Sequence, residues 1–176
     1  VDMQERPGGE CLFRGCIPSK TLLYLAELIR DADRAQSMGI TFGHPQIDLG
    51  TIRKWKQHVI DSLADGLVTL SKKRGVQLIQ GRVAFEGSDR ARLYDADISH
   101  IKFRHAILAT GSHPSSLKGV VFNEEGRVMD YARALELADI PETLHFEWRE
   151  SWMDKPEHGC FPAGTLVLTP SGPRPI

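Results

Sequence analysis

The chain has 176 residues, of which 41% are hydrophobic and 26% charged, and its net charge is −1. These proportions are typical of a soluble globular protein, and the balanced charge argues against a nucleic-acid surface or a polybasic membrane patch. No apolar run approaches the roughly 20 residues that cross a bilayer. Three cysteines do not make a secreted disulfide framework, so we expect a cytoplasmic protein.

Two long helices are predicted in the first half of the chain. Apolar residues recur at three- and four-residue spacing over residues 19–38, and Gly39 is a natural stop. A connector with glycine, proline and aspartate leads to a second helix over about 49–74. That helix carries one apolar stripe, which we expect to pack in the core or between domains: Ile52, Trp55, Val59, Leu63, Leu67 and Leu70.

Short strands and one further helix are predicted after Gly75. The predicted strands are residues 76–87, 91–98 and 101–111, the first two joined by a turn at 88–90. A short helix is predicted within 131–144, ending at Pro141. The composition changes after Leu144, so we divide the chain into a first unit (1–144), a divergent linker (145–159) and a β-like tail (160–176).

Cys11 and Cys16 stand where a loop leads into a helix. On a regular helix, residues five apart lie about 8–9 Å apart, too far for a disulfide, so bridging needs a bend that Gly15 makes easy. The helix N-terminus and Lys20 would lower the pKa of a thiol here, which favours a reactive cysteine. Two buried free cysteines and half of a zinc site are the alternatives; no second ligand pair supports zinc, so we expect no metal.

The segment GGECLFRGCIPSKTLL resembles the redox-disulfide signature of the flavoprotein disulfide reductases, and AILATGSHP resembles a strand at their FAD site. Ser19 before Lys20 is similar to the branch that holds the dihydrolipoamide dehydrogenases and mercuric reductases, and the connector with the second helix is similar to the dihydrolipoamide dehydrogenases. A mercuric reductase is the near alternative. The resemblance covers residues 1 to about 144 and implies an α/β fold: an incomplete FAD-binding Rossmann-like (doubly wound) domain with a helical pair and a small antiparallel β segment.

The resemblance also implies residue roles. Cys11 and Cys16 would form the redox-active disulfide that passes electrons from dihydrolipoamide to FAD and then NAD. Cys11 would exchange with the substrate and Cys16 would lie against the flavin, with Lys20 near its N5 atom. Asp2 would hold the adenosine ribose. The other residues expected at the FAD site are Gly8, Gly9, Val83, Thr110 and Gly111.

The same resemblance implies partners. These are dihydrolipoamide or the lipoyl domain of 2-oxoacid dehydrogenase complexes, and a second subunit in a homodimer. We expect the chain to be a fragment: the glycine-rich pyrophosphate turn, the NAD domain and the interface domain of the family are not recognisable in its 176 residues. By itself it would show no turnover and retain FAD weakly.

The tail GCFPAGTLVLTPSGPRPI resembles instead the first block of a Hint domain, the fold of inteins and other self-processing proteins. The resemblance implies that Cys160 attacks the carbonyl of Gly159 to give a thioester. A base from a later block would be needed, and we expect it beyond Ile176. The alternative is a Pro/Gly-rich hairpin with a buried cysteine.

Overall fold

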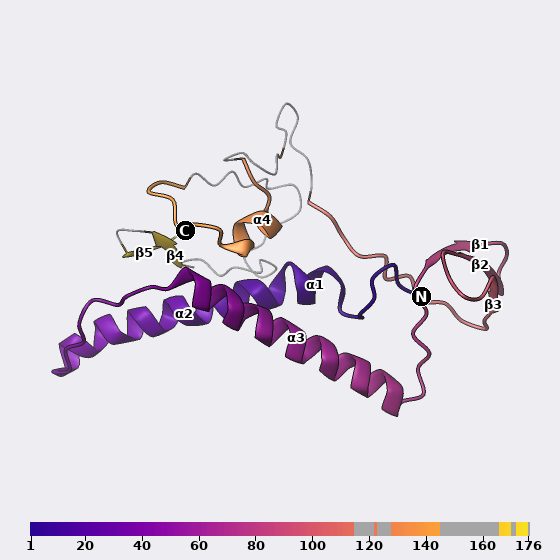
Figure 1. Ribbon diagram of the computed structural model, residues 1–176, viewed down its shortest axis with the longest axis horizontal. Coiled ribbons are helices and arrows are strands. Elements are labelled where there is room, and N and C mark those ends of the chain that lie inside the picture. Colours follow the sequence, from indigo (N-terminus) through magenta and orange to yellow (C-terminus); the bar gives the residue numbers. More distant parts are fainter. Residues whose placement is uncertain (115–121, 123–127, 145–165, 170–171, 176) are drawn as a thin grey trace.

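The computed structural model describes residues 1–114, 122, 128–144, 166–169 and 172–175 (Figure 1). Two long helices lie side by side and form its largest part, while a small antiparallel sheet lies apart from them. No helix among these residues is both long and apolar enough to span a membrane.

Both predicted long helices are confirmed, with a different start for the first. Helix α2 spans Cys16–Ala35 rather than beginning at Ser19, and the 3₁₀ helix η1 (Gln36–Met38) continues it. Gly39 ends this run in the left-handed conformation (φ 88°). Helix α3 spans Leu49–Lys73.

The start of α3 is fixed by a side-chain cap. The carboxylate of Asp48 accepts hydrogen bonds from the Thr51 backbone N–H (3.1 Å) and from the Thr51 hydroxyl (2.7 Å). These bonds hold the pKa of Asp48 below its usual value. Gly75, at φ 69°, follows the end of the helix as expected.

A short helix that the sequence analysis did not predict precedes α2. Helix α1 spans Gly9–Phe13 and carries Cys11. Its Leu12 is buried, as are Ala26 of α2 and Ile60 and Ala64 of α3, so these small and medium side chains form the helical core. The apolar stripe of α3 is only partly covered, since Leu63 and Leu70 are 45% and 50% exposed.

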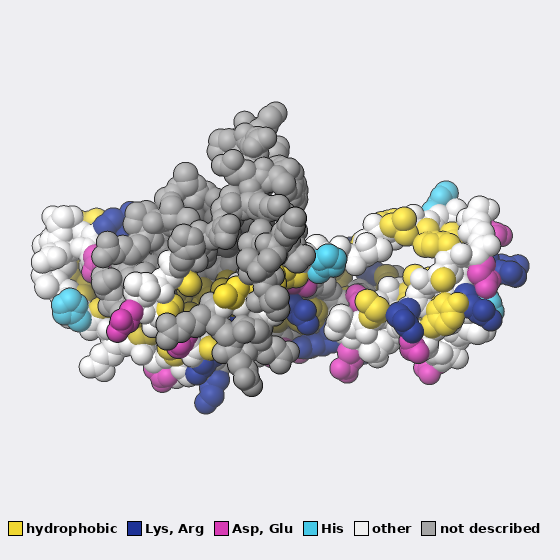
Figure 2. Space-filling view, turned by 90° about the horizontal axis from the view of Figure 1, so that it is seen from above, with side chains coloured by type: hydrophobic (Ala, Val, Ile, Leu, Met, Phe, Trp, Pro, Cys, Tyr) yellow, Lys and Arg dark blue, Asp and Glu magenta, His cyan; other side chains and the backbone are white. Residues whose placement is uncertain are grey.

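The small sheet is antiparallel, as predicted, but its strands are shorter. Its strands are β1 (Arg82–Phe85), β2 (Arg90–Tyr94) and β3 (His100–Lys102), in the order β1-β2-β3. Val83 pairs with Leu93, and Ala91 with Ile101. Asp95 ends β2 at a positive φ of 58°. Ala91 and Leu93 are buried on one face, while hydrophobic side chains also remain visible at the surface (Figure 2).

The predicted strand over residues 101–111 is wrong beyond Lys102. Residues 104–111 form no strand, and Ile107 and Leu108 are 93% and 72% exposed. An apolar strand of this kind is stable between parallel neighbours, and none of the described segments pairs with it. Among the described residues, parallel pairing is limited to the bridge between Asp2 and Gln80.

Helix α4 (Tyr131–Glu136) is shorter than predicted and ends at Leu137, four residues before Pro141. Leu137 adopts φ 57°, which is left-handed and stops the helix. The backbone of the tail forms a hairpin of β4 (Leu166–Thr169) and β5 (Gly172–Pro175), which agrees with the β-like pattern there.

Candidate functional site: a thiol pair at a helix junction

The junction between α1 and α2 brings the two cysteines together. The carbonyl oxygen of Glu10 accepts hydrogen bonds from the backbone N–H groups of Arg14 (2.9 Å) and Gly15 (2.8 Å). Gly15 then precedes the first residue of α2, Cys16, at φ −117° and ψ −96°. The chain therefore bends between the cysteines, as the sequence analysis required.

Both cysteines are free thiols, Cys11 exposed and Cys16 half-buried. A side-chain hydrogen bond with the Cys16 thiol raises the pKa of Cys11, and burial raises it further. The backbone N–H of Cys16 and the charge of Lys20 lower this pKa, but the raising effects are larger. The expectation of a lowered pKa is therefore wrong for Cys11, because the thiol–thiol contact stabilises its protonated form.

The first turn of α2 is held by its own hydrogen bonds. The Ser19 N–H donates to the Gly15 carbonyl and the Ser19 hydroxyl to the Cys16 carbonyl, both at 3.0 Å. Pro18 stands in this turn, where its missing N–H costs nothing. The position of the Cys16 backbone is thus fixed from two sides.

Gly8 and Gly9, expected at the cofactor, have different surroundings. Gly8 adopts φ 146°, and a Cβ there would lie 2.3 Å from Cδ2 of Leu12, so packing alone demands glycine. Gly9 adopts φ 61°, and a Cβ there would meet nothing within 4 Å. The backbone of Gly9 is therefore open to a close approach by another group.

Asp2 and the segment before Val83 lie together. The Asp2 N–H donates to Ile79 (3.0 Å), and the Asp2 carbonyl accepts from the Gly81 N–H (2.8 Å). The exposed Asp2 carboxylate accepts one hydrogen bond, from the Gln4 N–H at 2.9 Å, and keeps acceptor capacity for other donors. Val83 follows on the edge strand β1. Asp2 therefore forms the parallel bridge with Gln80, and Val83 follows three residues after this bridge.

Thr110 and Gly111 are exposed and lie in a segment without regular secondary structure. Gly111 adopts φ 82°, which suits glycine. Neither residue makes a hydrogen bond within the described part of the chain. Gly159 and Cys160 lie outside the described residues.

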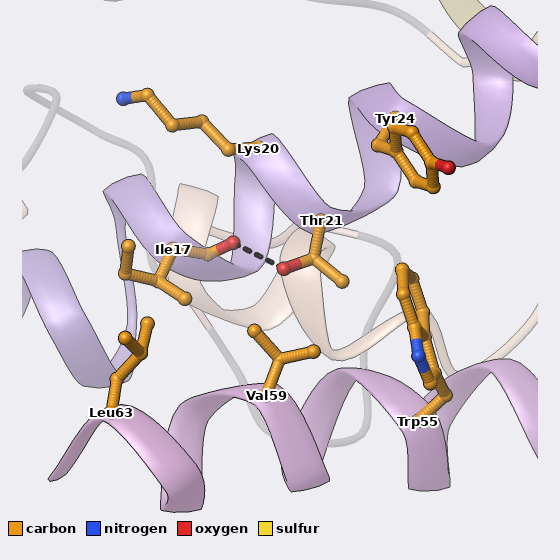
Figure 3. Close-up of a pocket in the computed structure, with 7 residues that line it drawn as sticks. All are labelled: Ile17, Lys20, Thr21, Tyr24, Trp55, Val59 and Leu63. Atoms are coloured by element: carbon orange, nitrogen blue, oxygen red, sulfur yellow. Dashed lines mark hydrogen bonds between the residues drawn. The ribbon is translucent and has the colours of Figure 1, made fainter. Parts of the chain in front are cut away.

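An apolar groove of about 280 Å³ runs between α2 and α3 and begins one residue beyond Cys16 (Figure 3). The rings of Tyr24 and Trp55 lie against each other at its far end, tilted by 37° with centroids 6.2 Å apart. The Lys20 side chain points away from the cavity in Figure 3. The residues lining the groove are Ile17, Lys20, Thr21, Tyr24, Trp55, Val59 and Leu63.

Two residues near the thiols were missed by the sequence analysis. The Tyr131 hydroxyl donates a 2.8 Å hydrogen bond to Oε1 of Glu10, the neighbour of Cys11. Burial, followed by Glu10, raises the pKa of Tyr131 to about 12. No local pattern could reveal a contact across 121 residues of sequence.

No group of three or more potential ligand side chains is placed to hold a metal ion within the described ranges.

Comparison with known proteins shows the family to which the chain belongs. The pyridine nucleotide-disulphide oxidoreductase family matches residues 1–147, and the chain belongs to that family. Similar proteins include the dihydrolipoyl dehydrogenases of Buchnera aphidicola (38% identical over 142 residues, 80% of this chain) and Vibrio parahaemolyticus (38% over 145 residues, 82%). The family resemblance is therefore confirmed.

A solved structure shares the fold. LpdA from Mycobacterium tuberculosis superposes on 81% of this chain with a TM-score of 0.66 at 23% identity, and the match covers 32% of the LpdA chain. The α/β Rossmann-like fold class is confirmed on this basis. The chain spans about 30% of the length of the two curated relatives.

Proposed function

We propose that this chain is part of an FAD-dependent dihydrolipoyl dehydrogenase and that Cys11 and Cys16 are its redox-active thiol pair. The observation that carries the proposal is the bend at a helix junction that places two free cysteines beside each other, so that the Cys16 thiol is the largest cause of the raised pKa of Cys11. Thiol–disulfide exchange requires an accessible attacking sulfur and a second sulfur beside it. Cys11 is the exposed, exchanging thiol, and Cys16 is the half-buried one that resolves the mixed disulfide.

The residues present fit FAD. The open backbone of Gly9 and the spare acceptor capacity of Asp2 suit a cofactor with a ribose and a polar chain. Lys20 lies in the first turns of α2, four residues after Cys16, and its side chain extends away from the groove. FAD supplies an acceptor for the electron pair that the thiols give up. The residues proposed to hold it are Asp2, Gly8, Gly9, Lys20, Val83, Thr110 and Gly111.

The proposed substrate is dihydrolipoamide, free or on a lipoyl domain, with NAD as the final electron acceptor. The named relatives favour this over the mercuric reductase alternative. The apolar groove beside Cys16 supports a substrate with an aliphatic arm. A homodimer of the full-length protein and a cytoplasmic location complete the proposal.

The test uses the whole chain and needs no flavin. The reduced chain is mixed with oxidised lipoamide, a cyclic disulfide. The Cys11 thiolate opens the ring to a mixed disulfide, and Cys16 then attacks the Cys11 sulfur. One intramolecular disulfide forms, and both thiol protons end on dihydrolipoamide. Mass spectrometry should find the bridged chain.

Two single variants test which cysteine attacks lipoamide and which one closes the disulfide. Cys16→Ser should stop the reaction at a lipoamide adduct on Cys11, while Cys11→Ser should form adducts far more slowly because Cys16 is half-buried. Cys160→Ala serves as the matched control and should behave as the unchanged chain. Equal reaction of Cys11→Ser and the unchanged chain would refute the role given to Cys11.

We propose a second candidate function for the tail: self-processing at the Gly159–Cys160 bond. The β4–β5 hairpin supports a β-rich element at this point. Attack by the Cys160 thiol on the Gly159 carbonyl would exchange the amide for a thioester and free the Cys160 amine. In a chain extended beyond Ile176 to include the expected base, an excess of a small thiol should then release residues 1–159 as a thioester, and Cys160→Ala should remain whole. An extended chain that stays uncut at long incubation would refute this function.

A further inference from the structure

A hydrogen bond connects the last described helix of the first unit to the helix that carries Cys11. Tyr131, the first residue of α4, donates to Oε1 of Glu10 at 2.8 Å. Both side chains are near the surface, and Tyr131 is 40% exposed. Since Glu10 immediately precedes Cys11, this bond acts on the peptide unit next to the thiol.

The backbone of Glu10 is also the acceptor that closes the bend between the cysteines. Its carbonyl receives the N–H groups of Arg14 and Gly15. The side chain and the main chain of this one residue therefore join α4 to the turn that brings Cys11 to Cys16.

Helix α4 is itself fastened to α3 at its other end. Arg53 of α3 donates to the carbonyl oxygens of Leu137 (3.3 Å) and Ala138 (2.9 Å). The buried Lys56 donates to the carbonyl of Leu135. These cations satisfy carbonyls at the helix C-terminus, where positive charge is favourable. Tyr131 thus extends from an anchored helix.

Helix α1 also packs against α2 and α3. Leu12 is buried, and the Arg6 guanidinium lies 5.5 Å from the Phe13 ring centroid. Arg6 in turn bonds Asp61 of α3 at 2.8 Å. These contacts hold the C-terminal half of α1, and the Tyr131 bond holds its N-terminal half at Glu10.

We propose that Tyr131 is a positioning residue for the thiol pair: through Glu10 it sets how readily Cys11 and Cys16 join in a disulfide. The inference rests on the proposed function of the pair. Tyr131 touches neither thiol, so its effect is on their relative position. When Tyr131 holds the Glu10 side chain, Cys11 can occupy fewer positions. The effective concentration of the Cys11 sulfur near the Cys16 sulfur is then higher.

The equilibrium is measured with glutathione on the full chain. The two cysteine thiols reduce one glutathione disulfide to two glutathione thiols, and the protein gains one disulfide. Tyr131→Phe removes only the hydroxyl. Because a hydrogen bond is worth about 1 kcal/mol, the equilibrium constant for disulfide formation should fall about fivefold. Tyr94→Phe is the control, since Tyr94 is similarly exposed (45%) and lies in the sheet.

A second variant tests the route through Glu10. Glu10→Ala should lower the constant as much as Tyr131→Phe, and the double variant no further, because both changes remove the same bond. Additive losses, or an unchanged constant in Tyr131→Phe, would overturn the inference while leaving the proposed function in place. Failure of the unchanged chain to form the disulfide at all would overturn both.

Discussion

The backbone N–H of Gly15 lies 2.8 Å from the carbonyl oxygen of Glu10, and this bond closes the turn between the two thiols. It spans five residues instead of the four of a regular α-helix. The extra residue is what ends α1 and lets α2 begin at Cys16. The relative position of the two cysteines therefore depends on this backbone bond.

Gly15→Ala should disturb this turn. A Cβ at Gly15 would stand 3.3 Å from the Glu10 oxygen and 3.7 Å from Cα of Cys11, so the carbonyl must shift. We expect a cost of about 1 kcal/mol to the junction and about fivefold slower exchange with lipoamide, followed by mass spectrometry. Gly43→Ala is the control, because a Cβ there meets nothing within 4 Å. Equal rates for both variants would contradict the prediction.

Cys16→Ala should lower the pKa of Cys11. The Cys16 thiol is the largest cause of the raised pKa, so its removal leaves the lowering effect of Lys20 less opposed. At neutral pH the thiolate fraction of Cys11 rises, and alkylation by iodoacetamide becomes faster. The pH dependence of alkylation measures this, in a Cys160→Ala background so that one thiol remains. Lys20→Met should move the pKa of Cys11 the other way.

The phenol of Tyr131 should lose its proton at a higher pH than an ordinary tyrosine. Burial first, and then the Glu10 carboxylate, raise its pKa to about 12, above the value of about 10 in an unfolded chain. Its contribution to stability is therefore complete below about pH 10 and lost as the pH rises toward 12. The phenolate absorbance is measured against pH for the unchanged chain and for Tyr131→Phe. The difference between the two curves is the titration of Tyr131. Glu10→Ala should lower this pKa without returning it fully to 10, because burial remains.

Two glycine substitutions should act in opposite directions on stability. Gly66 is exposed in the middle of α3 with open space at its Cβ position, so Gly66→Ala should add about 1 kcal/mol to the free energy of unfolding. Gly8→Ala should remove about 2 kcal/mol or more, because its φ of 146° and the 2.3 Å approach to Leu12 both oppose a side chain. Urea denaturation followed by circular dichroism measures both. A stabilised Gly8→Ala would contradict the packing described for Leu12.

Local signals predicted much of the fold. The apolar spacing and the glycines at 39 and 75 located both long helices, and the turn near residue 88 located the hairpin of β1 and β2. The unusual signature around Cys11 and Cys16 located the candidate site. These features depend on neighbours in sequence, which is why the sequence reveals them.

Features that depend on distant partners could not be predicted. Helix α1 is too short to show a period. The apolar strand expected to end at Gly111 is not formed, because a strand needs a neighbour and sequence alone does not supply one. The raised pKa of Cys11 follows from its contact with another thiol, and the Tyr131 bond from a contact across the whole first unit. The missing strand, the raised pKa and the Tyr131 bond are tertiary effects.

The exposed apolar segment at Ile107 and Leu108 has a practical consequence for work with this chain. An extended, apolar stretch with free backbone donors and acceptors can add to the strand edge of another molecule. Self-association should therefore begin there and grow with protein concentration. A charged substitution such as Ile107→Lys should suppress this concentration-dependent growth in light scattering, and it should leave the helices that carry the thiols unchanged.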